Sequence, residues 1–249
     1  MARRSEIDSY LSAMLQTASF KDYGPNGLQV EGRDEVRLIV SGVTASRALI
    51  DAAIEAEADA LLVHHGLFWR GHDGRIAGWL KQRLQRLLTH DINLYAYHLP
   101  LDAHAEFGNN AQFGSRLGLT ADARFGEQYL GFIGTASEPI SVAELTDRVQ
   151  RLSGREPTCI EGDGRPLARL AWCTGGAQSY FEAAIAAGAD AFITGELSEP
   201  QAHLARETGV AFIACGHHAS ERYGAQALGE HLVTRFGIKH LYIEIDNPA

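Results

Sequence analysis

The sequence LLVHHG at residues 61–66 is an apolar run that ends abruptly in two histidines and a glycine. Such a run is typical of a strand in a parallel α/β sheet, because helices cover both faces of the sheet and leave no solvent-facing positions. His64 and His65 would then stand at the carboxyl end of the strand, the edge where open α/β sheets bind their ligands. The stretch predicts an α/β fold with a polar site at one sheet edge.

The composition excludes several classes of protein. The chain has 249 residues, of which 45% are hydrophobic and 21% charged, as in a globular protein of one large domain or two lobes. Its net charge of −9 offers no general attraction to phosphate backbones, so nucleic-acid binding is not expected without a local basic patch. The three cysteines form no disulfide framework, and we see neither a signal peptide nor a membrane span. We expect a cytoplasmic protein without a membrane segment.

An internal repeat supports this fold and extends it. Residues 52–60 align without gaps to residues 183–191 and are identical to them at seven of nine positions. Alanine is common in helices, so chance explains part of the match, but it does not easily explain the shared isoleucine and the Ala-Asp-Ala before each apolar strand. Because repeats fix an architecture, this one predicts two copies of a strand–helix–strand unit. The same alignment places His65 opposite Glu196.

A second correspondence follows the next strand of each copy. His98 and Asp102 form an H-x-x-x-D pattern, and His217 and Glu221 form the corresponding H-x-x-x-E pattern. Each half of the chain then consists of a strand, a helix, a strand with a polar end, a helix, and a strand followed by H-x-x-x-acid. Right-handed crossovers bring these polar strand ends to one edge of the sheets.

Together the two correspondences predict an α/β protein of two similar, interwoven lobes that arose by internal duplication. Each lobe is expected to contain a layered sheet with helices on both faces. The lobes are placed at residues 1–122 and 123–249, although the halves can interlace, and a metal site is expected between them.

The residues at these strand ends are of the types that bind divalent metals. Neighbours on a strand point to opposite faces, so His64 and His65 could bind different ions, or one ion if the backbone turns at Gly66. His217 and Glu221 are four residues apart and share one face if a helix begins near His217. Each residue also has an ordinary alternative role, as a core histidine, a capping histidine or a solvated glutamate.

Taken jointly, the pattern favours two metal ions over one. The candidate ligands offer imidazole nitrogens and carboxylate oxygens, which suit Zn, Mn, Fe, Co or Ni: His64, His65, Asp102, His217 and Glu221. Five ligands are more than one structural zinc needs, so we expect two ions with a bridging carboxylate, which would be Glu221. His98 and Glu196 are the candidates to move a proton during catalysis. For Asp102 alone, a turn after Pro100 is an equally ordinary explanation.

Seven motifs of this chain closely resemble those of the YbgI-type dinuclear metal-centre proteins, known as GTP cyclohydrolase I type 2 homologues. The resemblance runs from about residue 5 to residue 249, with these motifs: 25–30 (PNGLQV), 42–44 (GVT), 63–66 (VHHG), 98–102 (HLPLD), 108–110 (GNN), 193–196 (ITGE) and 216–221 (GHHASE). It implies that the five candidate ligands hold two metal ions. It also implies a toroidal homohexamer of two-lobed subunits, with the metal sites facing a central cavity.

The function that follows is a dinuclear metal-dependent hydrolase acting on a small molecule. The resemblance implies GTP cyclohydrolase-like opening of the purine ring, while amide and phosphoester hydrolysis remain open. The alternative is a non-enzymatic metal-binding ring that acts as a scaffold, a metal store or a regulatory protein, with or without bound nucleic acid. The net charge of −9 argues against the nucleic-acid version.

Overall fold

Two α/β units make up the chain, and the computed structural model describes every residue from 1 to 249. The first unit contains residues 1–108 and 224–246, and the second contains residues 109–223 and 247–249. The units interlace along the chain, because its last long helix and last strand return to the first unit. The predicted α/β class is confirmed. The boundary predicted between residues 122 and 123 separates the two copies of the repeated sequence. It stays a prediction.

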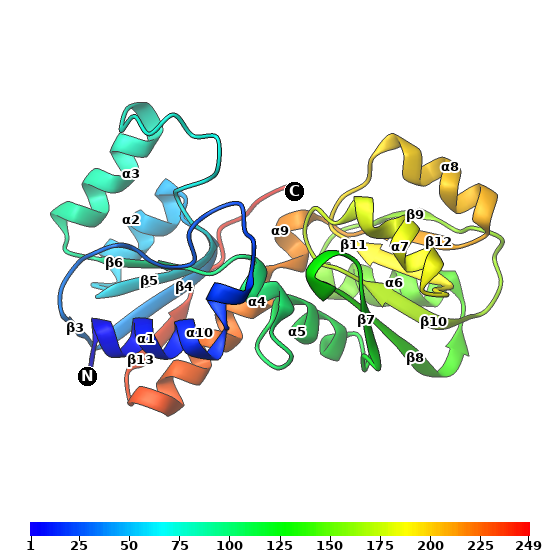
Figure 1. The fold of residues 1–249 in the computed structure, drawn as a ribbon, viewed down its shortest axis with the longest axis horizontal. Helices are drawn as coiled ribbons and strands as arrows, with labels where there is room; N and C mark the ends of the chain where they lie inside the picture. The colour runs from blue at the N-terminus through cyan, green and yellow to red at the C-terminus, as the bar shows by residue number, and fades with distance from the viewer. The chain divides into compact units, whose positions relative to one another are not determined.

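A five-stranded sheet forms the centre of the first unit, in the order β13-β4-β5-β6-β2 (Figure 1). Four strands are parallel, and β2 pairs antiparallel with β6 at one edge. The strands of this sheet are β2 (Gly27–Val30), β4 (Leu38–Thr44), β5 (Ala60–His65), β6 (Asn93–Ala96) and β13 (Lys239–Tyr242). A separate ribbon pairs β1 (Ala2–Arg3) with β3 (Glu35–Val36).

Helices cover both faces of this sheet, as Figure 1 shows for the first unit. One face carries α2 (Arg47–Glu55) and α3 (Gly78–Thr89), and the other carries α1 (Arg4–Met14) and α10 (Arg222–Phe236). The short helix α4 (Leu99–Ala103) begins just after β6, and a 3₁₀ turn, η1 (Thr17–Ser19), follows α1. The layered arrangement explains why the central strands are almost continuously hydrophobic.

Strand β5 shows how the apolar run leads to a polar end. Leu61 and Val63 pack in the cluster under α2 and α3, whereas Leu62 packs in the cluster with α1 and α10. All three are fully buried, and each such burial stabilises the fold by about 1.5–3 kcal/mol. Because strand residues alternate between faces, His64 continues the row of Leu62 and His65 continues the row of Val63. The two histidines therefore leave the strand end in different directions.

A six-stranded mixed sheet forms the centre of the second unit, in the order β7-β8-β10-β11-β12-β9. Its three central strands are parallel, and β8 and β9 pair antiparallel with the strands beside them. The strands of this sheet are β7 (Ala123–Phe125), β8 (Gly131–Ile140), β9 (Thr158–Ile160), β10 (Leu167–Trp172), β11 (Ala191–Thr194) and β12 (Ala211–Ala214).

The helices of the second unit also cover both faces of its sheet. Side chains of α5 (Asn109–Arg116) and α6 (Val142–Ser153) share one core with the central strands. On the other face, Phe181 at the start of α7 (Phe181–Ala186) stacks on Phe192 and meets Phe212 edge-on. The remaining helices are α8 (Glu199–Thr208), α9 (His217–Ser220) and the 3₁₀ turns η2 (Glu127–Tyr129) and η3 (Gln178–Tyr180). No helix is both long and apolar enough to cross a bilayer.

The duplication expected from the sequence is present in the strand register. Ile39 of β4 pairs with Ala60 of β5, and Leu170 of β10 pairs with Ala191 of β11, so equivalent positions of the two aligned copies make equivalent pairs. In each copy the following helix is succeeded by a third parallel strand, β6 or β12. Each third strand is followed by a short helix, α4 or α9.

The repeated Ala-Asp-Ala has a structural cause in both copies. The Asp59 carboxylate accepts hydrogen bonds from the backbone N–H groups of Arg37 (2.7 Å) and Leu38 (3.1 Å), where β4 begins. The Asp190 carboxylate accepts from the N–H groups of Ala168 (3.0 Å) and Arg169 (2.8 Å), where β10 begins. Each aspartate thus supplies an acceptor to two part-buried N–H groups at the start of a neighbouring strand.

Candidate metal centre

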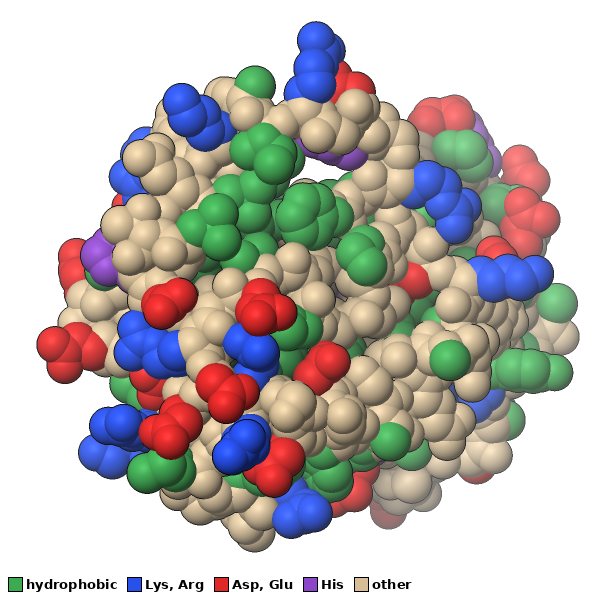
Figure 2. Space-filling view, turned by 60° about the vertical axis from the view of Figure 1, so that its left-hand side comes forward, with side chains coloured by type: hydrophobic (Ala, Val, Ile, Leu, Met, Phe, Trp, Pro, Cys, Tyr) green, Lys and Arg blue, Asp and Glu red, His purple; other side chains and the backbone are tan.

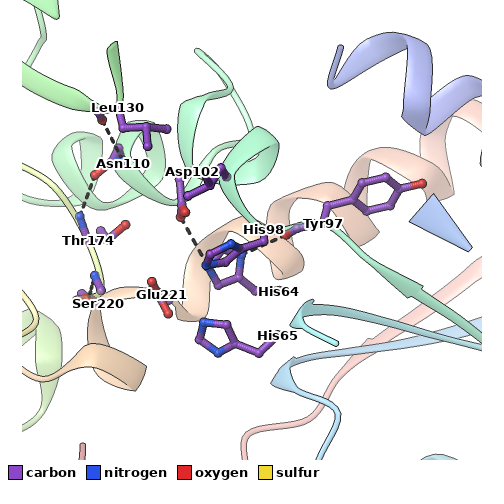
Figure 3. A network of polar contacts seen from close by, with 12 residues as sticks. His64, His65, Tyr97, His98, Asp102, Asn110, Leu130, Thr174, Ser220 and Glu221 are labelled. Carbon is purple, nitrogen blue, oxygen red and sulfur yellow. Dashed lines mark hydrogen bonds and ion pairs between the residues drawn. The ribbon is translucent and has the colours of Figure 1, made fainter. Parts of the chain in front are cut away.

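His64, at the end of β5, is fully buried and held as one tautomer. Its Nδ1 lies 2.9 Å from the carbonyl oxygen of Tyr97, which can only accept, so Nδ1 carries the proton (Figure 3). The neutral ring then has its lone pair on Nε2, which lies 3.5 Å from Oδ1 of Asp102. An imidazole whose Nδ1–H is held by a carbonyl, with Nε2 as the ligand atom, is the usual arrangement of a metal-binding histidine.

Three imidazoles of the first unit form a cluster. The ring centroid of His65 lies 4.5 Å from that of His64, and the ring of His98 lies 5.0 Å and 5.7 Å from those two rings. One ligand nitrogen from each ring lies within 4.8 Å of the others, so the cluster could hold a metal ion. Thr44 Oγ1 lies 3.1 Å from Nδ1 of His65 and orients this ring from the neighbouring strand.

Asp22, which the sequence analysis did not identify, holds His98. Its Oδ1 lies 2.6 Å from Nδ1 of His98, and the side chain is only 3% exposed. Asn26 joins the two residues: its Nδ2 donates to Asp22 Oδ2 (2.8 Å), and its Oδ1 accepts from the backbone N–H of His98 (2.7 Å). The N-terminal loop thus determines where the ring of His98 lies. No local pattern marks this contact, because the partners are far apart in the sequence.

The loop after His65 is fixed by the same N-terminal segment. Gln29 accepts a hydrogen bond from the N–H of Leu67 (2.8 Å) and donates to the carbonyl of Pro25 (2.8 Å). At Gly66 an added Cβ would lie 2.2 Å from the Gln29 side chain, so a larger residue would displace Gln29 from these hydrogen bonds. Trp69, further along the loop, meets the ring of His98 edge-on at 5.1 Å.

Large hydrophobic side chains stay exposed on the first unit near this loop. Tyr23 is 58% exposed, Ile76 61% and Trp79 53%. Figure 2 shows hydrophobic side chains gathered in a hollow on the face of this unit, with charged side chains around them. The ring of Tyr23 lies 6.1 Å from that of His98, so aromatic surface borders the histidine cluster.

In the second unit, His217 and Glu221 form the pair expected from their spacing. Nε2 of His217 lies 3.1 Å from Oε2 of Glu221, whose side chain is 3% exposed. Nδ1 of His217 donates to Oε1 of Glu196 at 2.6 Å, so Glu196, which follows β11, orients this ring. Burial alone would lower the pKa of His217, but the hydrogen bonds and charges of Glu221 and Glu196 outweigh it and raise the pKa to about 9.

Gly175 lies directly against Glu221. An added Cβ at Gly175 would lie 2.0 Å from Oε1 of Glu221, and its φ of +72° is in the left-handed region that favours glycine. The N–H of Gly175 donates to Oγ of Ser220 (2.9 Å), and the N–H of the preceding residue, Thr174, donates to Oδ1 of Asn110 (2.8 Å) (Figure 3). The first of these bonds gives Asn110 of the motif at residues 108–110 a role, because it holds the loop that carries Gly175.

A small cavity borders the His217–Glu196 pair within the second unit. Its volume is about 180 Å³, which suits one small chemical group rather than a whole nucleotide. Arg155, Glu156 and Thr158 also line it and offer both hydrogen-bond donors and acceptors. A polar substrate group could therefore enter beside His217.

The predicted site residues thus fall into two groups, one in each unit. His64, His65, His98 and Asp102 lie together in the first unit. His217, Glu221 and Glu196 lie together in the second. That the two groups meet around the same ions stays a prediction.

Comparisons with known proteins agree on one family. The model of the family described as DUF34/NIF3 (NGG1p interacting factor 3) matches residues 2–248. A "GTP cyclohydrolase 1 type 2 homolog" of Pseudomonas aeruginosa is 53% identical over 98% of this chain and 96% of its own length. One of Neisseria meningitidis is 49% identical over the whole of both chains.

Two solved structures are similar along the whole chain. The one described as "protein ybgI, unknown function" superimposes with a TM-score of 0.95 at 46% identity, covering 99% of this chain and 100% of that one. TTHA1606 from Thermus thermophilus superimposes with a TM-score of 0.92 at 35% identity, with the same coverage. The predicted resemblance to the YbgI-type proteins is therefore confirmed.

Proposed function

This chain belongs to the DUF34/NIF3 family, and on that premise we propose that it is a metal-dependent hydrolase that works with two divalent cations. The proposed ligands come from both units: His64, His65, Asp102, His217 and Glu221. Their imidazole and carboxylate donors suit Zn, Mn, Fe, Co or Ni, and metal availability decides among these.

The observation that carries the proposal is the pair of proposed ligands His64 and His65 in the first unit, with the ring of His98 beside them. One ligand nitrogen from each ring lies within 4.8 Å of the others, and Nδ1 of His64 is held by a carbonyl. A divalent cation can accept several imidazole lone pairs at once, whereas protonated rings at this spacing would repel one another. The donor set therefore fits a cation.

Two residues beside the proposed ligands have catalytic roles that follow from their contacts. A pair of bound cations would supply Lewis-acid activation of water and of the scissile group. His98, with Nδ1 held by Asp22, would accept a proton from the attacking water through Nε2 and later return it to the leaving group. Glu196 would hold the ring of His217 and offers a second acceptor for that proton.

The names of the relatives guide the choice of substrate. Several relatives are called GTP cyclohydrolase 1 type 2 homolog, so hydrolytic opening of the GTP purine ring is the first reaction to test. Amide and phosphoester hydrolysis use the same kind of metal-activated water and come next. Aromatic surface beside the histidine cluster supports a substrate with a planar ring.

We further propose that the protein works as a homohexamer in the cytoplasm. The whole-length resemblance to the YbgI-type proteins supports this assembly. Light scattering of the purified protein should give six times the mass of the 27.1 kDa chain. A monomer or dimer under these conditions contradicts the proposed hexamer and leaves the proposed metal ligands unaffected.

The experiment that tests the activity is a substrate screen with matched blanks. Protein purified without chelator is loaded with each candidate metal and incubated with GTP, with amides and with phosphoesters. Turnover should appear in the wild-type protein and vanish in Glu221→Ala, while His203→Ala, an exposed histidine on α8, should keep it. Equal turnover in wild type and Glu221→Ala contradicts the proposal. A protein that binds metal but turns over none of these compounds favours a scaffold or storage role.

A further inference from the structure

The Asp22 carboxylate in the first unit has four polar partners, three N–H donors and one ring nitrogen. Oδ1 lies 2.6 Å from Nδ1 of His98 and accepts from the backbone N–H of Tyr23 (2.6 Å). Oδ2 accepts from Nδ2 of Asn26 (2.8 Å) and from the backbone N–H of Leu99 (2.9 Å). Three of the four partners are fixed N–H donors, which an ionised carboxylate satisfies best. An ionised carboxylate can only accept, so the contact with Nδ1 of His98 requires the ring to carry its proton there.

The charge and burial of this carboxylate agree with that assignment. Burial alone would raise the pKa of Asp22, but the hydrogen bonds and the charge of His98, together with the bonds from Asn26 and Tyr23, outweigh it and lower the pKa. Buried carboxylates of this kind orient their partners firmly, because charge-assisted hydrogen bonds are short and strong.

We propose that Asp22 is a positioning residue that keeps the proton of His98 on Nδ1, so that Nε2 presents its lone pair to His64 and His65. The placement rests on the contacts alone, while the use of Nε2 for proton transfer rests on the proposed function. The segment at residues 25–30, singled out in the sequence for its resemblance only, thereby acquires a role, because Asn26 ties Asp22 to the backbone of His98.

Asp22→Asn tests the proposal because an amide cannot satisfy all four partners. An NH₂ in place of Oδ2 would face Asn26 Nδ2 and the N–H of Leu99, and neither can become an acceptor at that contact. An NH₂ in place of Oδ1 would face one fixed N–H, that of Tyr23, and the ring of His98, which can accept once it changes tautomer. The amide should therefore take the Oδ1 position and move the ring proton to Nε2.

The experiment is a long-range ¹⁵N–¹H correlation spectrum of metal-free protein with labelled histidine. It is recorded at a pH where the His98 signals are those of a neutral ring, and these signals are assigned by their loss in His98→Gln. The wild-type protein should show His98 predominantly with the proton on Nδ1, and Asp22→Asn should show it predominantly on Nε2. A wild-type ring protonated at Nε2, or a folded Asp22→Asn protein with an unchanged tautomer, overturns the proposal.

Glu199→Gln is the matched control. It alters another histidine–carboxylate pair, in which Nε2 of His203 lies 2.8 Å from Oε1 of Glu199 on the exposed surface of α8. It should change only the His203 signals. If Asp22→Asn does not fold, the wild-type spectrum alone decides. Zn²⁺ titration of the wild-type protein is read separately: absence of Zn²⁺ binding contradicts the proposed function and leaves the tautomer result standing.

Discussion

The two copies of the duplicated unit share a scaffold and differ at their strand ends. Asp59 and Asp190 occupy equivalent positions and make the same pair of hydrogen bonds to the start of a neighbouring strand. At the other end of the strands, β5 finishes in two histidines, whereas β11 is followed by Gly195 and Glu196. The duplication therefore keeps the residues that build the sheet, and the site chemistry lies where the copies differ.

The copies also differ in the source of the carboxylate that holds an imidazole. In the second copy, Glu196 follows the repeat's own strand β11 and binds Nδ1 of His217. In the first copy, the corresponding position is occupied by His65, and Asp22 from the N-terminal loop binds Nδ1 of His98 instead. One side of the proposed site is thus supported from within the repeat, and the other from a segment outside it.

The largest effect is expected when the shared scaffold is broken. Asp59→Ala removes the acceptor of two part-buried N–H groups and the 2.8 Å ion pair with Arg33, so the free energy of unfolding should fall by about 2–4 kcal/mol. Asp190→Ala should lower the free energy of unfolding by less than Asp59→Ala does, because the Asp190 side chain is 23% exposed compared with 10% for Asp59. Urea unfolding measures both values.

Asp34→Ala serves as the control for this pair of variants. Asp34 is an exposed residue whose side chain forms a 3.8 Å ion pair with Arg3, so the free energy of unfolding should change by less than about 1 kcal/mol. Equal losses in Asp59→Ala and Asp34→Ala would refute the scaffold role of Asp59.

The next effect concerns Gly175, whose counterpart in the first copy is Thr44. Gly175→Ala places a methyl group 2.0 Å from Oε1 of Glu221 at a φ of +72°, so stability should fall by roughly 1–3 kcal/mol. Bound metal should fall with it, because Glu221 must move. Thr44→Ala removes the hydroxyl beside His65 together with the γ-methyl group, and it should lower the free energy of unfolding by about 0.5–1.5 kcal/mol. Calorimetry of both variants measures the loss of stability, and metal analysis measures the loss of bound metal. Unchanged metal content in Gly175→Ala contradicts the prediction that Glu221 must move.

A smaller effect is expected from pH, through His217 in the metal-free protein. The pKa of this group is raised from 6.5 to about 9 in the folded chain, so folding favours its protonated form. The resulting stability is fully present below about pH 6.5 and is lost as the pH rises toward 9. Urea unfolding at about pH 6 and about pH 9 should show this loss in the wild type, and His217→Gln should reduce it. An equal pH dependence in both proteins rules out this assignment.

The smallest effect is expected for Glu199→Gln. This pair with His203 lies on the surface of α8, with side chains 79% and 61% exposed, so water screens it almost completely. The free energy of unfolding should change by less than about 0.5 kcal/mol when measured by urea unfolding. A loss larger than that for Thr44→Ala would contradict the ranking by burial.

Much of the fold could be predicted from the sequence, because it rests on local patterns. The apolar run before His64 and the repeated Ala-Asp-Ala predicted buried strands and a duplication, and strand register confirms both. The spacing of His217 and Glu221 predicted their contact, because residues four apart share a helix face.

What the sequence could not predict depends on long-range packing. Asp22 lies in a loop with no periodicity, and only the fold brings it to His98. The return of α10 and β13 to the first unit likewise leaves no local pattern in the sequence. The role of Gly175 depends on the side chain of Glu221, far along the chain, and no glycine pattern marks such a close approach.

The most direct test of the central claim is the metal content per chain in two variants, one from each copy of the repeat. Protein purified without chelator is analysed by mass spectrometry of its metals as wild type, His64→Ala and Glu221→Ala. If ligands from both copies bind the same ions, the wild-type protein should contain about two divalent ions per chain. Each variant should then contain less metal than the wild type and keep its fold. Wild-type metal content in either folded variant would contradict the account.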